Sequence, residues 1–571
     1  MRIDLLYTEP ATIEPIRFDD GMNVILGEKD ETSSKNNGVG KSLCIEFINF
    51  ALLKKKSESR VSRIPEEVFD PATFICVRFT LHGTQYTLKR SLAEAEQPRL
   101  VTEDRETIFL KLDDATDFLT GIMFAGSVPK TVSFREMMGL LIRDERSEFK
   151  SIVACYDTRL RIPDNYAPHL MLLGIDIGNY RQVRHTLKEI ERITSEEGRI
   201  RDSVKLLRQK KIDDARSDLN ALDEEVAAIN EAIENLETMP AFEIVQADML
   251  VIDEEMASLR RRKEALSQRS ARMAPIASAA TVDSDEIREF FDSLRSGLGT
   301  VVSRDLVEVL SFKDKIDQFQ RHVLEEKSKL VDAEIRHINK QLADLDKRYS
   351  KMLAVINQQG QLKSLRQTYA SYQIKSEELG QLKAFIGRYD QLALEKQSMK
   401  SEKEAGLLGL QGSITAAKEN LLSVQRTMLD IHQFIQGNRS ASFDVRTTSN
   451  KQVIDIVMRI DDDGSHSVER EKVFIYDISL LLNEATKFRH PGLLVHDNIF
   501  DVDEDTLDRS LEYLFTRAAF ALGQQYILTL NVDRIAHATE QVWYQDLKRA
   551  VVASFTKTER FLRATYQESQ A

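Results

Sequence analysis

The chain has 571 residues, of which 42 % are apolar and 30 % charged, with only 11 prolines and 23 glycines. Such a charge-rich sequence with few turn-forming residues is typical of long helices, and its length allows several domains. The net charge of −13 argues against a surface that coats DNA over its whole extent, but not against a local basic patch.

The cysteines and the apolar runs bear on the compartment. Cys44, Cys76 and Cys155 have no paired or metal-binding spacing, which is typical of a reducing cytosol. The first 20 residues lack the pattern of a signal peptide, and no apolar run reaches the roughly 18 residues of a membrane helix. The sequence therefore predicts a cytoplasmic protein with no membrane segment.

The N-terminal part reads as mixed α/β. Apolar runs predict strands at 3–7 and 22–26, and the second run leads into a glycine-rich loop. Residues 42–53 predict a helix with one apolar face. Two alternating stretches, 73–79 and 85–89, with the turn residues His82-Gly83-Thr84 between them, predict a β-hairpin.

The middle of the chain has the pattern of a coiled coil. Apolar residues alternate spacings of three and four in two runs, 219–236 and 331–356, and such a period lets two helices wind around one seam. Breaks are expected near Pro240 and in the small-residue stretch around Pro275, because proline interrupts helices. The pattern predicts a jointed arm with its tip near 270–310. An ordinary helical bundle is the alternative.

The last part returns to mixed α/β. Strands are predicted at 453–458, 493–496 and 526–530, and the C-terminal end is expected to be helical and moderately basic. His496, inside an apolar strand, is expected to be a hydrogen-bonded core residue. The expected division is an N-terminal lobe at 1–177, an arm at 178–437 and a C-terminal lobe at 438–571.

A predicted strand and helix flank a glycine-rich loop, Gly38-Val39-Gly40-Lys41-Ser42, which follows Asn36 and Asn37. A phosphate-binding loop requires this context, because backbone N–H groups and the helix N-terminus attract phosphate oxygens. Lys41 is expected to reach the outer phosphates and Ser42 to ligate Mg²⁺. Far along the chain, Asp497 follows an apolar strand and is expected to hold the same ion. The sequence thus predicts an ATP site built from both ends of the chain.

With these features the chain resembles the SMC/RecN/RecF group of ABC-type ATPases over nearly its whole length. It looks most like the SMC-like ATPases of bacterial three-component anti-phage systems. The segments that carry the resemblance are 23–27, 35–42, 469–477 and 496–497. The resemblance implies an α/β ABC-type ATPase head, assembled from the N- and C-terminal lobes, with an inserted antiparallel coiled-coil arm. It also implies that two heads dimerise around ATP, and that separate middle and effector subunits complete the system.

The chain departs from the family's pattern at the phosphate loop and at the signature segment. The first glycine of the usual loop spacing is replaced by Lys35, after a polar insertion. The signature segment corresponds to 463–469, where Ser465, Ser467 and Glu469 are expected to contact nucleotide. The motif is degenerate, and a polar loop that opens a helix is the alternative.

The catalytic positions depart as well. The family's glutamate after the Mg²⁺-binding acid is Asn498 here, which can position water but cannot accept its proton. Asp501, with Asp503 behind it, is the predicted substitute, although either could simply start a helix. Asn531 takes the place of the switch histidine. The usual glutamine of the Q-loop is absent, and Arg135 or Arg143 could serve that region. The departures favour slow or partner-dependent hydrolysis.

Two basic clusters are the only features that suggest DNA. One follows the phosphate-loop helix at 54–56, with Arg60 and Arg63, and the other was assigned to the C-terminal helices: Lys548, Arg549, Lys557, Arg560 and Arg563. Contacts to phosphates of double-stranded DNA need only such local charge, but basic residues at helix ends are usually just solvated.

The function that these features favour is a slowly hydrolysing, SMC-like ATPase. It would dimerise through ATP and couple this step to DNA or partner proteins in anti-phage defence. One alternative is a DNA repair or recombination ATPase of the same architecture. Another is a non-hydrolysing scaffold in which ATP cements a dimer, which the replacements Asn498 and Asn531 favour.

Overall fold

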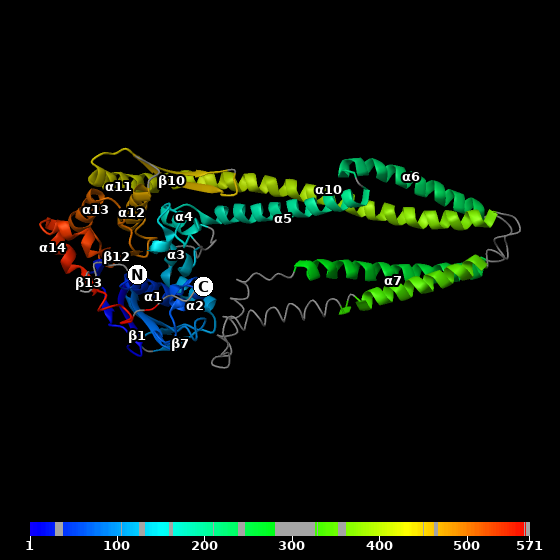
Figure 1. Ribbon diagram of the computed structural model, residues 1–571. Coiled ribbons are helices and arrows are strands. Elements are labelled where there is room, and N and C mark those ends of the chain that lie inside the picture. Colours follow the sequence, from blue (N-terminus) through cyan, green and yellow to red (C-terminus); the bar gives the residue numbers. More distant parts are fainter. Residues whose placement is uncertain are drawn as a thin grey trace. The chain divides into compact units, whose positions relative to one another are not determined.

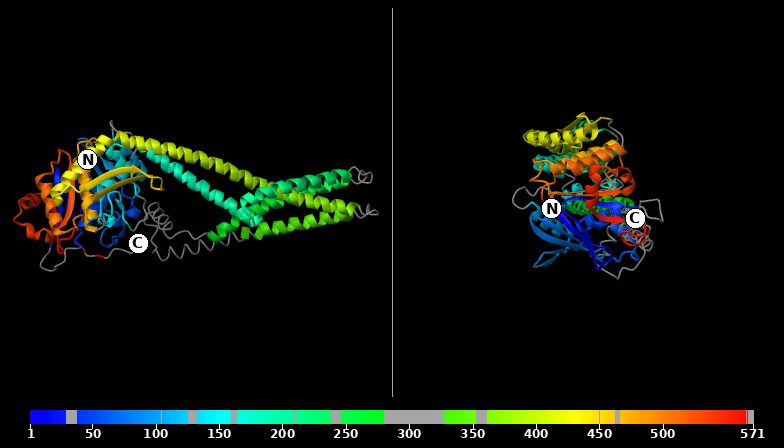
Figure 2. Two further views of the ribbon diagram at one scale, coloured as in Figure 1. Left: turned by 90° about the horizontal axis from the view of Figure 1, so that it is seen from above. Right: turned by 90° about the vertical axis from the view of Figure 1, so that its left-hand side faces the viewer.

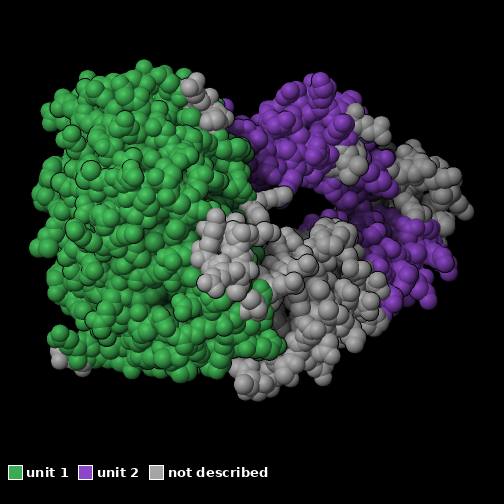
Figure 3. All heavy atoms as spheres, turned by 60° about the vertical axis from the view of Figure 1, so that its left-hand side comes forward, with its two compact units in different colours: residues 1–187, 401–571 green, residues 188–400 purple. Residues whose placement is uncertain are grey.

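The computed structural model describes residues 1–28, 38–103, 105–124, 132–158, 164–208, 210–237, 246–279, 326–327, 329–351, 361–448, 450–461, 466–564 and 566 (Figure 1). They form two compact units, which Figure 3 distinguishes by colour. We call residues 1–187 and 401–571 the head unit and residues 188–400 the arm unit.

The head unit contains a five-stranded sheet in which all strands are parallel. In spatial order its strands are β13 (Val551–Phe555), β3 (Gly21–Gly27), β12 (Gln525–Asn531), β11 (Leu493–His496) and β8 (Ile142–Arg143). The strands predicted around 22–26, 493–496 and 526–530 are confirmed. β12 lies between β3 and β11, so the carboxyl ends of all three meet at one edge of the sheet.

The prediction of a helical C-terminal end is wrong beyond residue 549. Helix α14 (Val542–Arg549) is followed by strand β13, which pairs with β3 at the edge of the parallel sheet. The run Val551-Val552-Ala553-Ser554-Phe555 includes β-branched residues, which favour a strand where a partner strand is present. Of the basic residues assigned to C-terminal helices, only Lys548 and Arg549 are helical.

A second, antiparallel sheet of six strands also belongs to the head unit. Its order is β2 (Ile16–Arg17), β1 (Arg2–Glu9), β4 (Phe74–Leu81), β5 (Thr84–Arg90), β6 (Arg99–Val101) and β7 (Glu106–Ile108). The predicted hairpin is confirmed by the pairing of β4 with β5. His82 and Gly83 at its turn have φ angles of 51° and 80°, as two-residue hairpin loops require. A separate hairpin joins β9 (Ala441–Thr447) and β10 (Ile454–Ile460).

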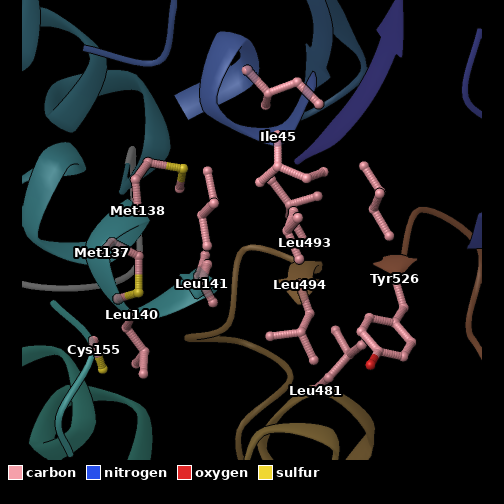
Figure 4. Close-up of a cluster of buried hydrophobic side chains, with 14 of the residues drawn as sticks. Ile45, Met137, Met138, Leu140, Leu141, Cys155, Leu481, Leu493, Leu494 and Tyr526 are labelled. Carbon is pink, nitrogen blue, oxygen red and sulfur yellow. The ribbon is translucent and has the colours of Figure 1, made fainter. Parts of the chain in front are cut away.

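Helix α1 (Lys41–Ala51) packs against β3 of the parallel sheet and against β4 and β5 of the antiparallel one. All of its residues except Ser42 are buried, so the predicted helix is correct but its apolar side is not confined to one face. On the opposite face of the parallel sheet lies α12 (His466–Leu482). Figure 4 shows Ile45 of α1 and Leu481 of α12 on either side of Leu493, Leu494 and Tyr526.

The remaining helices of the head unit flank these layers. They are α2 (Leu112–Met123), α3 (Phe134–Leu141), α4 (Ala167–Leu173), α11 (Lys418–Gln436) and α13 (Glu504–Thr516). Short 3₁₀ turns lie at Lys56–Glu58, Arg60–Arg63, Glu145–Ser147, Val532–Arg534 and Ala536–Ala538. Among the helices that the structure describes, none is long and apolar enough to cross a membrane.

Long helices make up the arm unit: parts of α5 (Ile177–Arg208) and α10 (Gln361–Ala416), the whole of α6 (Ile212–Glu237) and α7 (Gln246–Ala279), and a helical segment at 329–351. Ion pairs join Arg216 to Asp390, Asp223 to Lys383 and Glu225 to Lys375. The numbers rise in α6 while they fall in α10, so these two helices run antiparallel. Figure 2 shows the paired helices from two further directions.

The two heptad runs lie in different seams of the arm unit. One seam combines α5, α6 and α10 through Ile193, Ile200, Val204, Ile212, Ala215, Leu382, Ile386 and Leu392. The other joins α7 to 329–351 through Ile252, Met256, Leu345 and Tyr349. The runs at 219–236 and 331–356 therefore do not pack against each other. A heptad period specifies an apolar stripe but not the helix that covers it.

The predicted breaks have different outcomes. Helix α7 continues through Pro275 to Ala279, so the stretch around Pro275 does not end it earlier. A proline near a helix end removes one backbone hydrogen bond of the last turns, which a helix already held by its neighbour can tolerate. Pro240 and most of the expected tip at 270–310 lie outside the described residues.

Candidate functional site

A cavity of about 380 Å³ opens in the head unit near the carboxyl ends of the parallel strands. Residues from distant parts of the chain line it: Gly38, Val39, Gly40, Lys41, Ser42, Leu43, Arg60, Glu145, Asn498, Asn531, Arg560, Leu562, Ala564 and Tyr566. Because β3, β11 and β12 are parallel, the residues that follow them meet here although they are far apart in sequence. Asn36 and Asn37 lie outside the described residues.

Lys41 is buried at the floor of this cavity. Its Nζ donates a hydrogen bond to Asn531 Oδ1 at the end of β12. A Cβ atom on Gly27 would come within 2.6 Å of Lys41 Nζ, so glycine leaves room for the lysine to pass. Burial lowers the pKa of Lys41, although Asp497, Glu145 and Asp533 oppose this through their charges. Lys41 and Asn531, which the sequence assigned to the site separately, are thus in contact.

Asp497 follows β11 directly and is buried beside Ser42. Thr529 Oγ1 donates to Asp497 Oδ1 at 2.8 Å, and the Ser42 hydroxyl also forms a hydrogen bond with Asp497. Burial raises the pKa of Asp497 to about 6 despite these two bonds. A buried carboxylate next to a hydroxyl supplies the hard oxygen ligands that Mg²⁺ prefers. The donor set therefore suits a magnesium ion held together with phosphates.

The loop ahead of α1 has the backbone that close approach to phosphate demands. Gly38 and Gly40 have φ angles of 81° and 112°, a region that side chains other than glycine rarely adopt. Gly40 precedes the first helical residue, so the first-turn N–H groups of α1 have no partner within the helix. These N–H groups and the helix dipole favour an anion at the mouth of the loop.

Asn498 occupies a strained position behind Asp497. Its φ of 61° lies in the left-handed region, which asparagine tolerates better than most residues. The Asn498 N–H donates to Thr529 Oγ1 at 2.9 Å, and Arg470 Nη1 donates to its carbonyl at 2.8 Å. Its side-chain Nδ2 donates to Glu145 Oε1 at 3.2 Å, so the amide is directed at a carboxylate.

Glu145 lines this cavity although the sequence did not predict it as a site residue. It begins a 3₁₀ turn two residues after β8, the edge strand that pairs with β11. The sequence Ile142-Arg143-Asp144-Glu145 begins with an apolar residue and ends with two acids, and in this it is similar to the run that ends in Asp497. Because β8 has only two residues, this pattern was too short to predict a strand followed by a site residue.

The two arginines considered for the Q-loop region point elsewhere. Arg135 donates to Asn49 Oδ1 at 2.7 Å and to the Leu52 carbonyl at the end of α1. Arg143 is fully buried and pairs with Asp477 of α12, with 2.6 Å between Nε and Oδ2. Neither arginine lines the cavity.

The same Asp477 connects α12 to the strands that carry the site. His496 Nε2 contacts Asp477 Oδ2 at 2.9 Å, and His496 Nδ1 contacts the Tyr526 hydroxyl at 2.9 Å. Burial alone would raise the pKa of Asp477, but the charge of Arg143 and the bonds from His496 and Arg143 hold it below its usual range. The prediction that His496 is a hydrogen-bonded core residue is confirmed.

The other predicted site residues lie away from the lining of this cavity. Asp501 is 67 % exposed at its side chain and contacts Arg470 at 3.5 Å. Asp503 caps α13 by accepting from the Thr506 N–H at 2.9 Å. Ser467 Oγ donates to Asp503 Oδ2 at 3.4 Å, and Lys472 pairs with Glu469 at 2.8 Å. Ser465 lies outside the described residues.

The C-terminal segment after β13 closes one side of the cavity. The Phe561 N–H donates to the Val39 carbonyl at 3.2 Å, and Arg560 Nη1 donates to the Gly38 carbonyl at 3.1 Å. The Phe561 ring packs edge-on against Phe47 of α1 at 4.9 Å. Arg560, one of the basic residues that suggest DNA contact, is here bonded to the loop ahead of α1.

Two lysines of the first basic cluster, Lys54 and Lys56, are bonded within the protein. Lys54 is buried, with its Nζ 3.0 Å from Glu46 Oε2 and 3.3 Å from Asp144 Oδ2. Lys56 donates to the Leu92 carbonyl at 3.2 Å. Lys54 is therefore unavailable for a phosphate backbone in this structure, whereas Lys55 is exposed.

Comparisons with known proteins give a family match and distant relatives. Residues 431–566 match a family described as an uncharacterised protein conserved in bacteria (DUF2326). The uncharacterized protein YydD of Bacillus subtilis (strain 168) is 20 % identical over 551 residues, covering 90 % of each chain.

Two solved structures of Smc head domains are also similar. The Smc head domain with a coiled coil and joint from Pyrococcus yayanosii is 12 % identical with a TM-score of 0.33, covering 94 % of this chain and 93 % of that one. The head domain with an extended coiled coil bound to the C-terminal domain of ScpA, from Pyrococcus furiosus, is 11 % identical with a TM-score of 0.32, covering 94 % and 91 %.

Proposed function

We propose that this chain is an ATPase that binds Mg²⁺–ATP in the cavity of the head unit. The observation that carries the proposal is the contact between Ser42, at the start of α1, and the buried Asp497 after β11. A hydroxyl and a carboxylate from opposite ends of the chain meet directly below a left-handed glycine loop and a buried lysine. Phosphoryl transfer requires this combination of parts.

Each residue has a distinct task in this proposal. The backbone N–H groups after Gly38 and Gly40 hold phosphate oxygens, and Lys41 neutralises charge on the outer phosphates. Asn531 fixes the direction of Lys41 by accepting its hydrogen bond. Ser42 and Asp497 would hold Mg²⁺, which neutralises charge that develops on the phosphates during transfer.

The signature segment acts across a head dimer in this proposal. Ser467 and Glu469 lie on the first turn of α12 and do not line the cavity of their own chain. Together with Ser465 they would contact ATP bound by a second copy, as the family resemblance implies. The same resemblance is the source for coupling to double-stranded DNA, or to middle and effector subunits of a cytoplasmic anti-phage system.

Calorimetry with Mg²⁺–ATP on the wild type and on Lys41→Ala tests nucleotide binding. We expect the substitution to abolish measurable binding, because it removes the cation from a buried phosphate site. Lys55→Ala is the matched control, since Lys55 is exposed and outside the lining, and it should bind ATP as the wild type does. Equal binding by Lys41→Ala and wild type would contradict the proposal.

Hydrolysis needs a separate measurement, because a scaffold cemented by ATP would also pass the binding test. Single-turnover hydrolysis, with and without linear double-stranded DNA, separates the two functions. Phosphate release that is lost in Lys41→Ala supports an ATPase. Tight binding with ATP left intact, with or without DNA, favours the scaffold.

A further inference from the structure

Hydrolysis in this cavity needs a group that takes a proton from water. Asn498 stands at the position directly after Asp497, and a neutral amide cannot accept that proton. Among the described residues that line the cavity, Glu145 is the only carboxylate. It arrives from a different strand, β8, and its Oε1 accepts a hydrogen bond from Asn498 Nδ2.

From this contact we infer that Glu145 is the catalytic base of the head unit and that Asn498 is the residue that positions it. The inference rests on the proposed ATPase function and assigns a role within it. The carboxylate thus follows the edge strand β8, whereas an amide follows β11, where the family that the chain resembles has a glutamate.

The backbone around Glu145 is held in a way that suits such a role. The Asp497 N–H donates to the Arg143 carbonyl at 3.0 Å, so the chain just before Glu145 is tied to the magnesium-binding segment. Asp144 is fixed on the other side by Lys54 and by the Arg146 N–H at 3.0 Å. Glu145 itself is exposed to the cavity, and in the part of the chain that the structure describes it forms no ion pair.

The competing carboxylates are occupied or remote. Asp503 is the N-cap of α13, and its two oxygens accept from Thr506 and Ser467. Asp501 is solvent-exposed beside Arg470 and does not line the cavity. The prediction that Asp501 replaces the missing glutamate therefore has a better-placed rival in Glu145.

The chemistry balances without any further reactant than ATP and water. Glu145 takes one proton as the water oxygen forms its bond to the γ-phosphorus. The bond between that phosphorus and the bridging oxygen breaks, and ADP leaves with the electron pair. The proton then passes from Glu145 to the released phosphate or to solvent, which restores the carboxylate.

The test compares two variants that each replace one carboxylate by its amide, Glu145→Gln and Asp501→Asn. We expect Glu145→Gln to slow single-turnover hydrolysis by about 10²–10⁴-fold, the usual contribution of a general base. Asp501→Asn should stay within about twofold of wild type, because surface substitutions away from a site are mostly neutral. Both variants should bind ATP in calorimetry as the wild type does, and both should keep the wild-type melting temperature.

A second readout does not depend on turnover. After incubation with radiolabelled ATP and gel filtration, Glu145→Gln should retain intact ATP for longer than the wild type or Asp501→Asn. Adding Asn498→Asp to Glu145→Gln returns a carboxylate to the strand that carries Asp497, in a residue type that tolerates a φ of 61°. Partial recovery of hydrolysis in this double variant would support a general-base role for the carboxylate that Glu145 supplies in the wild type.

Two results would overturn the inference. The first is hydrolysis by Glu145→Gln at the wild-type rate, and the second is loss of ATP binding in that variant, which would give Glu145 a binding role. Failure of the proposed function is distinguishable, because then the wild type itself would either not bind ATP or keep bound ATP intact as long as Glu145→Gln does.

Discussion

The head unit contains an ion pair that is almost fully buried, whereas the ion pair compared with it in the arm unit is exposed. In the head unit, Arg143 and Asp477 form an ion pair whose side chains are 0 % and 2 % exposed. In the arm unit, the side chains of Arg216 and Asp390 are 44 % and 46 % exposed. Buried ions are costly unless they are fully paired, whereas exposed pairs contribute little. The head unit should therefore depend more on the pair of Arg143 with Asp477 than the arm unit depends on the pair of Arg216 with Asp390.

The buried apolar clusters of the two units differ in size and continuity. One continuous cluster of buried side chains joins both sheets and the helices of the head unit. The described residues of the arm unit form two small clusters, of eight and four buried residues, along the helix seams. A defect in the head unit can thus disturb the site through shared packing, while a defect in the arm unit stays local to one seam.

The largest expected effect comes from breaking the buried pair. Asp477→Asn leaves Arg143 buried without a counterion, and we expect it to destabilise the head unit by about 3–5 kcal/mol. The matched change in the arm unit, Asp390→Asn, should cost less than about 1 kcal/mol. Urea unfolding followed by the single tryptophan, Trp543 of the head unit, measures the first, and helical circular dichroism measures the second. Equal losses in the two units would contradict the comparison.

Asp497 gives the head unit a pH dependence of known sign. Its folded pKa of about 6 lies above the value of 3.8 for an unperturbed aspartate, so the folded state holds the proton more tightly. As pH rises from 4 to above 6, the head unit loses stability through this group, by about 2–3 kcal/mol for a shift of this size. Asp497→Asn should therefore stabilise the nucleotide-free head unit at pH 7.5, and the gain should vanish near pH 4. Urea unfolding in EDTA at both pH values checks this, and a destabilised variant at pH 7.5 would contradict it.

Two glycines extend the comparison to backbone packing. A Cβ on Gly40 would lie 2.5 Å from Phe561 Cβ, at a φ of 112°, so Gly40→Ala should destabilise the head unit by about 1–3 kcal/mol. Gly387 lies in α10 with nothing within 4 Å of an added Cβ, and Gly387→Ala should stabilise the arm unit by about 0.5–1 kcal/mol. Thermal melting at matched concentration measures both. A stabilising Gly40→Ala would show that the C-terminal segment does not pack against the loop in solution.

Local patterns in the sequence were sufficient to predict the structure of those segments whose conformation depends mainly on their own residues. The hairpin at β4 and β5 follows from alternation around His82 and Gly83, and the loop before α1 follows from its glycines. The contact between Lys41 and Asn531 does not follow from a local pattern, because it depends on β12 lying between β3 and β11. Only the family resemblance suggested that Asn531 belongs to the site.

Long-range placement is what the sequence could not supply. Strand β8 has two residues, too few for any period, and only its pairing with β11 brings Glu145 to Asn498. Strand β13 exists because β3 offers it an edge. In the arm unit, the heptad period marks an apolar stripe on α6, but the choice of α10 as partner depends on charges that flank the seam, such as Asp223 with Lys383.

The smallest expected effect is that of a single exposed pair in the arm unit. Arg388 donates from Nε and Nη2 to Glu196 Oε1 at 2.9 and 2.7 Å, which is good geometry, yet both side chains are more than 30 % exposed. A double-mutant cycle of Arg388→Met and Glu196→Gln should give a coupling of about 0.2–1 kcal/mol. Because the pair faces solvent, the coupling should fall further in 1 M salt, where the Debye length is about 3 Å. A coupling of several kcal/mol that persists in salt would mean that the arm unit, like the head unit, depends on individual charges, and the contrast between the two would fail.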